Sequence, residues 1–230
     1  MVECIVFAGG GGHAAVVQDA AKLSWKETTL KVVWDSSTRV HQSLQEWVHV
    51  QHEEDLQQLL THKQFSEILC YVCFGDPALR IQKVQCLRKV CKSISVICLF
   101  PNVVHSAAFL SDASVIHEGN YFGPHAVLEA GARVGCFCIV NAAAVVAHDC
   151  QVHDFVNVNP HACICGSVII KSGVIIGAGA VVREKTYIET GVQIGMGSVV
   201  TKDIMRSDCT CFGVPARYRY SVTEKATGES

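Results

Sequence analysis

The chain has 230 residues, of which 50% are hydrophobic and 17% are charged, and its formal net charge is −2. This composition supports a sizeable core and excludes an intrinsically disordered chain, and the lack of a basic surplus argues against a nucleic-acid partner. No apolar run approaches the roughly 18 residues that a membrane-spanning helix needs, so we expect no membrane partner. The first residues lack the features of a secretory signal peptide, and we therefore expect a cytoplasmic protein.

The first hundred residues alternate short β-rich runs with helical runs. Alternation of this kind predicts a small parallel sheet with helices packed on it, which is a Rossmann-like α/β domain over residues 1–100. Pro77 fits the start of the third helix, because the backbone N–H of a first helical residue has no acceptor within the helix and can be missing without loss. Strands are expected at 4–8, 30–34, 68–74 and 95–100, and helices at 13–23, 53–60 and 78–90.

Four glycines, residues 9–12, join the first predicted strand to the first helix. A strand, a glycine-rich turn and a helix can hold a phosphate through backbone amides and the helix N-terminus. Asp35 follows the second strand, where Rossmann-type sheets place an acid that contacts a ribose or base. This pattern also fits NAD. A dehydrogenase is disfavoured, because the alternating segment is short and nothing after it resembles a hydride-transfer domain.

Thirteen cysteines are present, which is many for a chain without a secretory signal. Cys70 and Cys73 have the spacing of a zinc knuckle or a redox pair, but they lie inside an apolar strand-like run with no second pair nearby. We expect buried free thiols that act as small hydrophobic side chains, and no metal site.

From residue 101 onward the sequence has a period of six. Every sixth residue from Val104 to Val200 is aliphatic or Phe, and a small residue often follows four positions later. The period is neither 3.6 nor 2, so it predicts neither ordinary helices nor hairpins. It predicts a parallel β-helix of triangular cross-section over residues 101–217, in which three hexads complete a coil. Coils would stack about 4.8 Å apart, so that residues 18 apart become neighbours.

The hexads and several local motifs resemble the hexapeptide-repeat acyltransferases. Within them, the match is to the family of sialic-acid O-acetyltransferases and nucleotide-amino-sugar N-acetyltransferases. The resemblance implies an α/β domain followed by an all-β left-handed parallel β-helix, a homotrimer, and acetyl-CoA bound between neighbouring β-helices. The motifs that carry it are Phe7-Ala-Gly-Gly-Gly-Gly-His13, Phe74-Gly-Asp76 with Arg80, Asn141 to Asp149, Ile176-Gly-Ala-Gly-Ala180, Ile194-Gly-Met-Gly-Ser198, Val200-Thr-Lys-Asp203 and Gly213-Val-Pro-Ala-Arg217.

Acyl transfer to an amine or a hydroxyl needs a base, a positioned thioester and donors for the oxyanion. His148 is the best candidate for the base, and Asp149 beside it can fix the tautomer of the imidazole. From the residues alone, His148 is either a base or a surface histidine, whereas the resemblance implies the catalytic role. Gly166 follows His148 by one coil, and its backbone N–H is expected to bind the acetyl carbonyl oxygen.

The resemblance also implies contacts with acetyl-CoA. Ala178 and Met196 lie 18 residues apart in two Gly-x-Gly motifs, and the matching family positions offer backbone groups to the pantetheine arm. Asn157 is a departure, because the family commonly has a second histidine there that touches acetyl-CoA. Asn141 and Asn159 are also 18 apart and form either a ladder of side-chain amides or, at Asn141, a substrate contact.

The nucleotide is expected at the N-terminal domain. The resemblance places Gly11, Gly12 and His13 toward the phosphate and sugar and Asp35 and Ser36 toward the base. Gly75, Asp76 and Arg80 would line the same crevice, and Arg80 is either a diphosphate ligand or a solvated helix residue.

The sequence therefore predicts an acetyl-CoA-dependent N-acetyltransferase for a nucleotide-linked amino sugar. O-acetylation of a sialic acid or another sugar hydroxyl stays an alternative, as does a non-catalytic repeat scaffold. Residues 218–230 are read as a polar tail.

Overall fold

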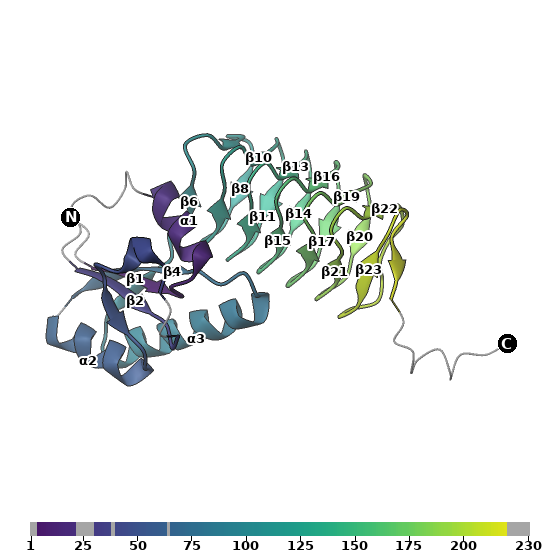
Figure 1. The fold of residues 1–230 in the computed structure, drawn as a ribbon. Coiled ribbons are helices and arrows are strands. Elements are labelled where there is room, and N and C mark those ends of the chain that lie inside the picture. The colour runs from purple at the N-terminus through teal and green to yellow at the C-terminus, as the bar shows by residue number, and fades with distance from the viewer. Residues whose placement is uncertain (1–3, 22–29, 38–39, 64, 220–230) are drawn as a thin grey trace, which may run out of the picture. The chain divides into compact units, whose positions relative to one another are not determined.

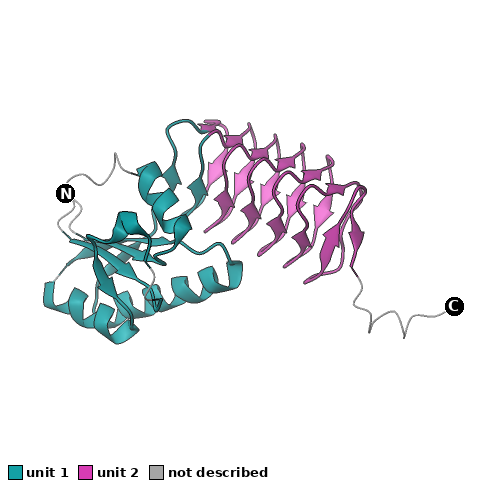
Figure 2. Ribbon diagram, in the orientation of Figure 1, with its two compact units in different colours: residues 1–108, 117–124 teal, residues 109–116, 125–230 magenta. Residues whose placement is uncertain are grey.

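The computed structural model describes residues 4–21, 30–37, 40–63 and 65–219. The chain divides into two compact units, the first comprising residues 1–108 and 117–124 and the second residues 109–116 and 125–230 (Figure 2). The unit boundaries therefore assign residues 101–108 and 117–124, which carry the first hexads, to the α/β unit.

A five-stranded parallel sheet forms the centre of the first unit, in the order β3-β2-β1-β4-β5. Helices α2 and α3 lie on one face of this sheet and α1 lies on the other (Figure 1). The strands are β1 (Cys4–Ala8), β2 (Leu30–Trp34), β3 (Val48–Val50), β4 (Glu67–Val72) and β5 (Ile97–Leu99), and the helices are α1 (Gly12–Ala21), η1 (Gln42–Leu44), α2 (Glu53–Lys63) and α3 (Pro77–Ser93).

Most elements of this unit follow the sequence prediction to within a few residues. All five residues of β1 are buried, as expected for the central strand of a sheet covered on both faces. The prediction missed β3, a three-residue edge strand whose first two residues are exposed, so that it carries no continuous apolar run. The predicted first helix extends to residue 23, and its last two residues lie outside the described part of the chain.

Short strands separated by turns make up the second unit, and they pair side by side into three sheets, in which every pairing but the last, between β23 and β24, is parallel. Face one consists of β7 (Phe109–Leu110), β10 (Val127–Leu128), β13 (Val145–Val146), β16 (Cys163–Ile164), β19 (Val181–Val182) and β22 (Val199–Val200). Face two consists of β8 (Val115–Ile116), β11 (Arg133–Val134), β14 (Gln151–Val152), β17 (Ile169–Ile170) and β20 (Tyr187–Ile188). Face three contains β12 (Ile139–Val140), β15 (Asn157–Val158), β18 (Ile175–Ile176), β21 (Gln193–Ile194), β23 (Thr210–Phe212) and β24 (Arg217–Tyr218).

The strand register confirms the coil of three hexads. Val127 pairs with Val145, and Val145 pairs with Cys163, so that each residue stacks on the residue 18 positions away. The β-helix is therefore a three-sided prism whose faces are the three sheets. The corresponding first strands in the α/β unit, β6 (Val103–Val104) and β9 (Tyr121–Phe122), pair in the same parallel manner.

The hexad aliphatics fill the interior of the prism. From Phe122 to Val200 every one of them is at most 3% exposed, whereas Val104, in the first coil, is 40% exposed. A first coil has a neighbouring coil on one side only, so its aliphatic side chain stays partly uncovered. The residue four positions after each interior aliphatic is also buried: Ala126, Ala144 and Ala162 are fully buried on one edge of the prism, and Val156 and Val174 are fully buried on another.

The C-terminal coil ends in an antiparallel pair. β24 pairs with β23 and includes Tyr218, the first residue of the predicted tail, and residues 220–230 lie outside the described part of the chain. Among the described residues, none of the helices has the length and apolarity that crossing a membrane requires.

Candidate active site

His148 and Asp149 form a pair on the edge of the prism between face one and face two. They occupy the turn between β13 and β14, and both side chains are largely exposed. His148 Nδ1 lies 2.9 Å from Asp149 Oδ2. An ionised carboxylate only accepts hydrogen bonds, so this contact places the proton on Nδ1 and leaves the lone pair on Nε2. The pair therefore has the arrangement of a general base with its orienting acid.

Gly166 lies directly under the imidazole ring, one coil further along the same edge. A Cβ added at Gly166 would lie 2.5 Å from His148 Nε2 and 2.6 Å from Cε1. Gly166 is itself buried. The His148 ring can therefore occupy this position only because residue 166 has no side chain.

Asp149 is seated in the same way on the coil before it. Gly131 has a φ of +75°, and a Cβ there would collide with Asp149 Oδ1. Both members of the pair thus rest on glycines that are one coil away, Gly166 for the histidine and Gly131 for the aspartate. The sequence analysis found Gly166 from the spacing of 18, but it missed Gly131, which follows from the same spacing.

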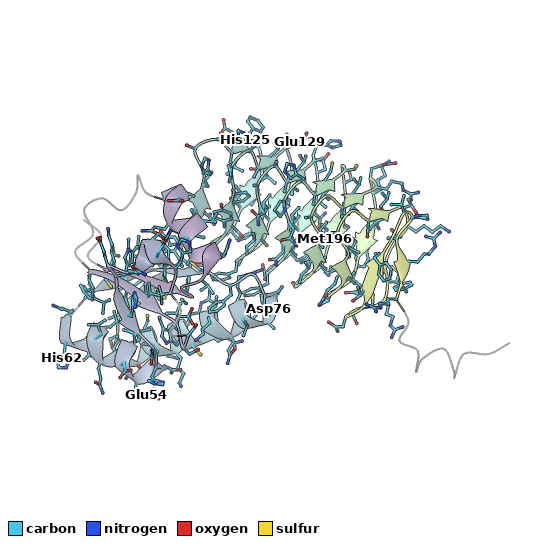
Figure 3. The ribbon with its side chains drawn as sticks, viewed as in Figure 1. Glu54, His62, Asp76, His125, Glu129 and Met196 are labelled. Atoms are coloured by element: carbon cyan, nitrogen blue, oxygen red, sulfur yellow. The ribbon has the colours of Figure 1, made fainter. Side chains whose placement is uncertain are left out.

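Glu129 is a further residue of this edge that the sequence analysis missed. Its Oε2 accepts a hydrogen bond of 2.9 Å from the backbone N–H of His148. Figure 3 shows Glu129 at the rim of the prism, on the turn after β10. The spacing offered a signal, since Glu129 stacks under Ala147 and so comes next to His148. The carboxylate fixes the backbone from which the imidazole projects.

Three backbone N–H groups that the sequence analysis singled out are left without a protein acceptor. They belong to Gly166, Ala178 and Met196, and none of them donates to any acceptor in the described part of the chain. Each follows an interior aliphatic residue by two positions, where the backbone turns outward. Unpaired N–H groups at such turns are available to carbonyl oxygens of a ligand.

Ala178 and Met196 lie on a different edge of the prism from His148. Their turns connect face three to face one, whereas His148 and Gly166 connect face one to face two. Met196 is 82% exposed and Ala178 is half-buried. Gly177, next to Ala178, packs closely against the following coil: a Cβ on Gly177 would lie 2.5 Å from Met196 N. A single chain therefore does not bring its own predicted pantetheine seat to its own His148.

The asparagines of the prism have different surroundings. Asn157 lies in β15 and is only 4% exposed, so the isolated chain offers little of its side chain to a ligand. Asn141 Oδ1 accepts a 2.8 Å hydrogen bond from Ala142 N, which closes its own turn. Among the described residues, the side-chain amides of Asn141 and Asn159 form no hydrogen bond with each other. Asn141 therefore does not take part in a ladder of side-chain amides, which was one of the two interpretations of this residue.

The glycine loop of the α/β unit is open at its tip. A Cβ at Gly11 or Gly12 would meet nothing within 4 Å, and α1 begins at Gly12. The N–H groups of the first helical turn have no partner within a helix. Asp35 acts at the base of this loop, since its Oδ2 accepts from Gly10 N at 2.7 Å and its Oδ1 from Ser37 N at 2.9 Å. Asp35, which the sequence predicts to contact the ribose or base, thus also positions the glycine loop.

Arg80 is neither a solvated helix residue nor an exposed ligand. It is 1% exposed, and its Nη1 donates to the carbonyl oxygens of Phe74 at 2.8 Å and Gly75 at 3.1 Å. Of the two alternatives for Arg80, the solvated arginine is therefore wrong, because the side chain folds back to bind the carbonyl oxygens of the loop that precedes α3. Asp76 caps this helix, accepting a 2.9 Å hydrogen bond from Leu79 N.

His13 faces Tyr121 within the same unit, and their ring centroids are 5.2 Å apart at an interplanar angle of 82°. Burial, followed by the nearby Arg80 charge, lowers the pKa of His13 to about 4, so the ring is neutral at pH 7. Tyr121 is 4% exposed, and its buried hydroxyl has no hydrogen-bond partner in the described structure. Such an orphan group beside His13 is a candidate ligand contact, and the sequence analysis missed it. Ser36 and Gly75 are exposed and open.

A scan against protein-family models found no match. GDP-perosamine N-acetyltransferase of Escherichia coli O157:H7 is 33% identical over 82 residues, which cover 36% of this chain and only 37% of that relative.

Two solved structures match almost throughout. A histidine variant of perosamine N-acetyltransferase from Caulobacter crescentus, in complex with CoA and GDP-perosamine, is 25% identical with a TM-score of 0.80, covering 96% of this chain and 99% of that one. The acetyltransferase domain of PglB from Neisseria gonorrhoeae FA1090, in complex with acetyl coenzyme A, is 28% identical with a TM-score of 0.77, covering 95% and 100%. In fold, and over almost its whole length, this chain is therefore similar to these two solved acetyltransferases.

Proposed function

We propose that this protein transfers the acetyl group of acetyl-CoA to the amino group of a nucleotide-linked amino sugar. The single observation that carries the proposal is the His148–Asp149 pair seated on glycines of the adjoining coils. The relatives described above support the substrate class, since two of them carry the name of an N-acetyltransferase for perosamine and one was solved with CoA and GDP-perosamine.

In the proposed reaction His148 is the general base. Its Nε2 takes a proton from the sugar amine while the nitrogen attacks the carbonyl carbon of the thioester. A C–N bond forms, the C–S bond breaks, and the CoA thiolate leaves and is reprotonated. Asp149 holds Nδ1–H, which keeps the accepting lone pair on Nε2 and stabilises the imidazolium that forms.

The Gly166 N–H is the proposed donor to the oxyanion. It belongs to a buried residue that packs against the His148 ring, and it donates to no protein acceptor in the described structure. A buried donor without a partner gains more from a hydrogen bond to a developing negative charge than an exposed donor does. Ala178 and Met196 offer their unpaired N–H groups to the amide carbonyls of the pantetheine arm.

The nucleotide part of the substrate is assigned to the α/β unit. The open tips of Gly11 and Gly12 and the first turn of α1 suit a phosphate, because the helix N-terminus carries a partial positive charge. Neutral His13 and the unpaired Tyr121 hydroxyl add hydrogen-bonding groups. Asp35 and Ser36 stay the proposed contacts of the base, and Gly75, Asp76 and Arg80 shape the neighbouring loop.

We further propose a homotrimer, in which the pantetheine seat of one chain faces His148 of its neighbour. The two edges border the same prism face in one chain but do not meet, so a complete site needs a second copy. A closed ring is the ordinary result of a repeated head-to-tail contact. We also propose a cytoplasmic location. None of the thirteen cysteines forms a disulfide, which suits a reducing environment.

Release of CoA tests the proposed activity. UDP-, dTDP- and GDP-linked amino sugars are compared with free sialic acid, and we expect turnover with one of the nucleotide amino sugars. His148→Asn should lower kcat by about 10²–10⁴-fold, as is typical of a lost general base. His161→Asn is the matched control, since His161 is an exposed histidine of the same prism and should keep wild-type kcat. Normal kcat in His148→Asn, or turnover of sialic acid alone, would contradict the proposal.

A further inference from the structure

Three cysteine side chains that the proposed function does not use converge in the α/β unit. Cys70 on β4, Cys91 on α3 and Cys98 on β5 bring their sulfur atoms within 4.8 Å of one another. Cys70 Sγ and Cys98 Sγ are 3.2 Å apart. Cys70 and Cys91 are each 1% exposed, and Cys98 is half-buried. The three thiols come from three separate elements, so their meeting is a product of the tertiary fold.

The sheet register explains why the strand thiols meet. Ile68 of β4 pairs with Cys98 of β5, so Cys98 projects to the same sheet face as Ile68 and therefore as Cys70 two residues later. Helix α3 packs against β4 and β5 and supplies Cys91 near its C-terminus. Cys73, which the sequence paired with Cys70, is not part of this cluster, and its thiol contacts the carbonyl oxygen of Tyr71 instead.

The geometry suits a small ion better than it suits three hydrophobic side chains. Zinc binds thiolate sulfur at about 2.3 Å, which sets the sulfur atoms of one site about 3.8 Å apart. The Cys70 and Cys98 sulfur atoms are 3.2 Å apart and all three sulfur atoms lie within 4.8 Å of one another, so the cluster has the size of such a site. The C-terminal end of a helix also favours a cation, because its partial charge is negative.

All three sulfur atoms belong to one group, because each of them lies within 4.8 Å of the other two. A disulfide between Cys70 and Cys98 would use two of the sulfurs and leave Cys91 unexplained.

We propose that Cys70, Cys91 and Cys98 form a binding site for a thiophilic d¹⁰ metal ion, of the class of Zn²⁺ and Cu⁺. Soft thiolate ligands select these ions over Mg²⁺ and Ca²⁺. The ion would join α3 to β4 and β5. Cys91 lies eleven residues after Arg80 on α3, which is about 16 Å along the helix axis, so the site is separate from the nucleotide loop.

Metal uptake by the reduced, purified full-length chain tests this site. The chain is titrated with Zn²⁺ against a chromophoric chelator and, separately, with Cu⁺ against a Cu⁺-specific chelator. We expect one equivalent of at least one of the two ions per chain, a higher unfolding midpoint, and slower alkylation of Cys98, the half-buried thiol of the cluster. Co²⁺ should give the charge-transfer absorption of thiolate ligation.

Three variants assign the ligands. Cys91→Ser and Cys98→Ser should each weaken uptake by at least about 100-fold, because each removes one of three ligands. Cys73→Ser is the matched control, a buried cysteine outside the cluster, and it should bind as the wild type does. Circular dichroism confirms that each variant is folded, and Cys98→Ser, at the half-exposed position, serves if Cys91→Ser does not fold.

Absence of uptake of both ions by the reduced wild-type chain would overturn the proposal, and so would uptake that survives Cys91→Ser and Cys98→Ser. Acetyl transfer is measured on the same samples. Since the cluster lies outside the proposed catalytic edge, loss of metal binding with normal acetyl transfer separates a failure of this site from a failure of the proposed function.

Discussion

Gly166 and the imidazole of His148 are in direct contact across adjacent coils, and a methyl group on Gly166 would overlap Nε2 and Cε1 of the ring. The contact joins the proposed base to the proposed oxyanion donor, so that the position of one depends on the size of the other. It also shows how a repeat with a fixed stacking distance builds a site from residues 18 apart.

Gly166→Ala should inactivate the enzyme while the prism stays folded. The added methyl group would push the exposed His148 ring away from its place, and a displacement of about 1 Å can cost about 10²-fold in rate. We expect kcat to fall by about 10²-fold, measured as CoA release, with a change in unfolding midpoint of a few degrees at most. Glu184→Ala, one coil further along the same edge, is the control, and equal activity of the two variants would contradict the role of Gly166.

Glu129 is predicted to position His148 through the backbone. Glu129→Ala removes the acceptor of the His148 N–H, and we expect kcat to fall by about 10-fold with KM for acetyl-CoA unchanged. Glu129→Gln keeps an acceptor oxygen and should recover most of the rate. A merely structural glutamate would give equal losses in the two variants, so the recovery is the informative measurement.

Mixing two inactive variants tests whether neighbouring chains share the site. His148→Asn lacks the base, and Ala178→Trp should block the pantetheine seat on the other edge. If each site combines the base of one chain with the seat of the next, random equimolar trimers should recover about a quarter of wild-type activity, from simple statistics of the interfaces. A mixture that is refolded together and stays inactive would show that one chain carries the whole site.

The pH dependence of stability should reveal His13. Burial and Arg80 lower its pKa to about 4 in the folded chain, whereas an unfolded histidine has a pKa near 6.5. Between these values the unfolded chain binds a proton that the folded chain does not. The contribution of His13 is therefore complete above pH 6.5 and is lost as the pH falls toward 4.

We expect the free energy of unfolding to drop by about 2 kcal/mol more in the wild type than in His13→Gln over this interval, measured by urea denaturation. The figure is less than the full shift would give, since the ring is partly exposed. Parallel pH profiles of the two proteins would contradict the assignment.

Arg80→Met should destabilise the α/β unit and change His13. The carbonyl oxygens of Phe74 and Gly75 lose a buried charged donor, which typically costs about 2–4 kcal/mol. Loss of the positive charge should also raise the pKa of His13, followed by NMR titration of its ring protons. Arg88→Met is the control, because Arg88 pairs with Glu118 at the surface and such pairs contribute under about 1 kcal/mol.

The period of six was enough to predict the prism and the stacking that brings Gly166 to His148. The aliphatic residue of each hexad is interior because a triangular coil turns that side chain inward at fixed intervals. Once the coil length is known, the neighbours of any residue follow by adding or subtracting 18. The same spacing could have predicted that Gly131 lies next to Asp149 and that Glu129 lies next to Ala147.

The α/β unit was less predictable, because its contacts do not repeat. Arg80 has the sequence context of a surface helix residue, yet its side chain is buried against the loop before α3. Nothing in the spacing of Cys70, Cys91 and Cys98 indicates that they meet, since their approach depends on the strand register and on how α3 packs.

The sequence by itself thus determined the architecture of the prism and the edge that carries His148, because a repeat converts sequence distance directly into spatial distance. Only the tertiary structure decided which groups support that edge, how Arg80 and His13 are arranged, and which three thiols converge. Those contacts join residues that have no regular spacing along the sequence, so side-chain packing sets their geometry and no sequence period predicts it.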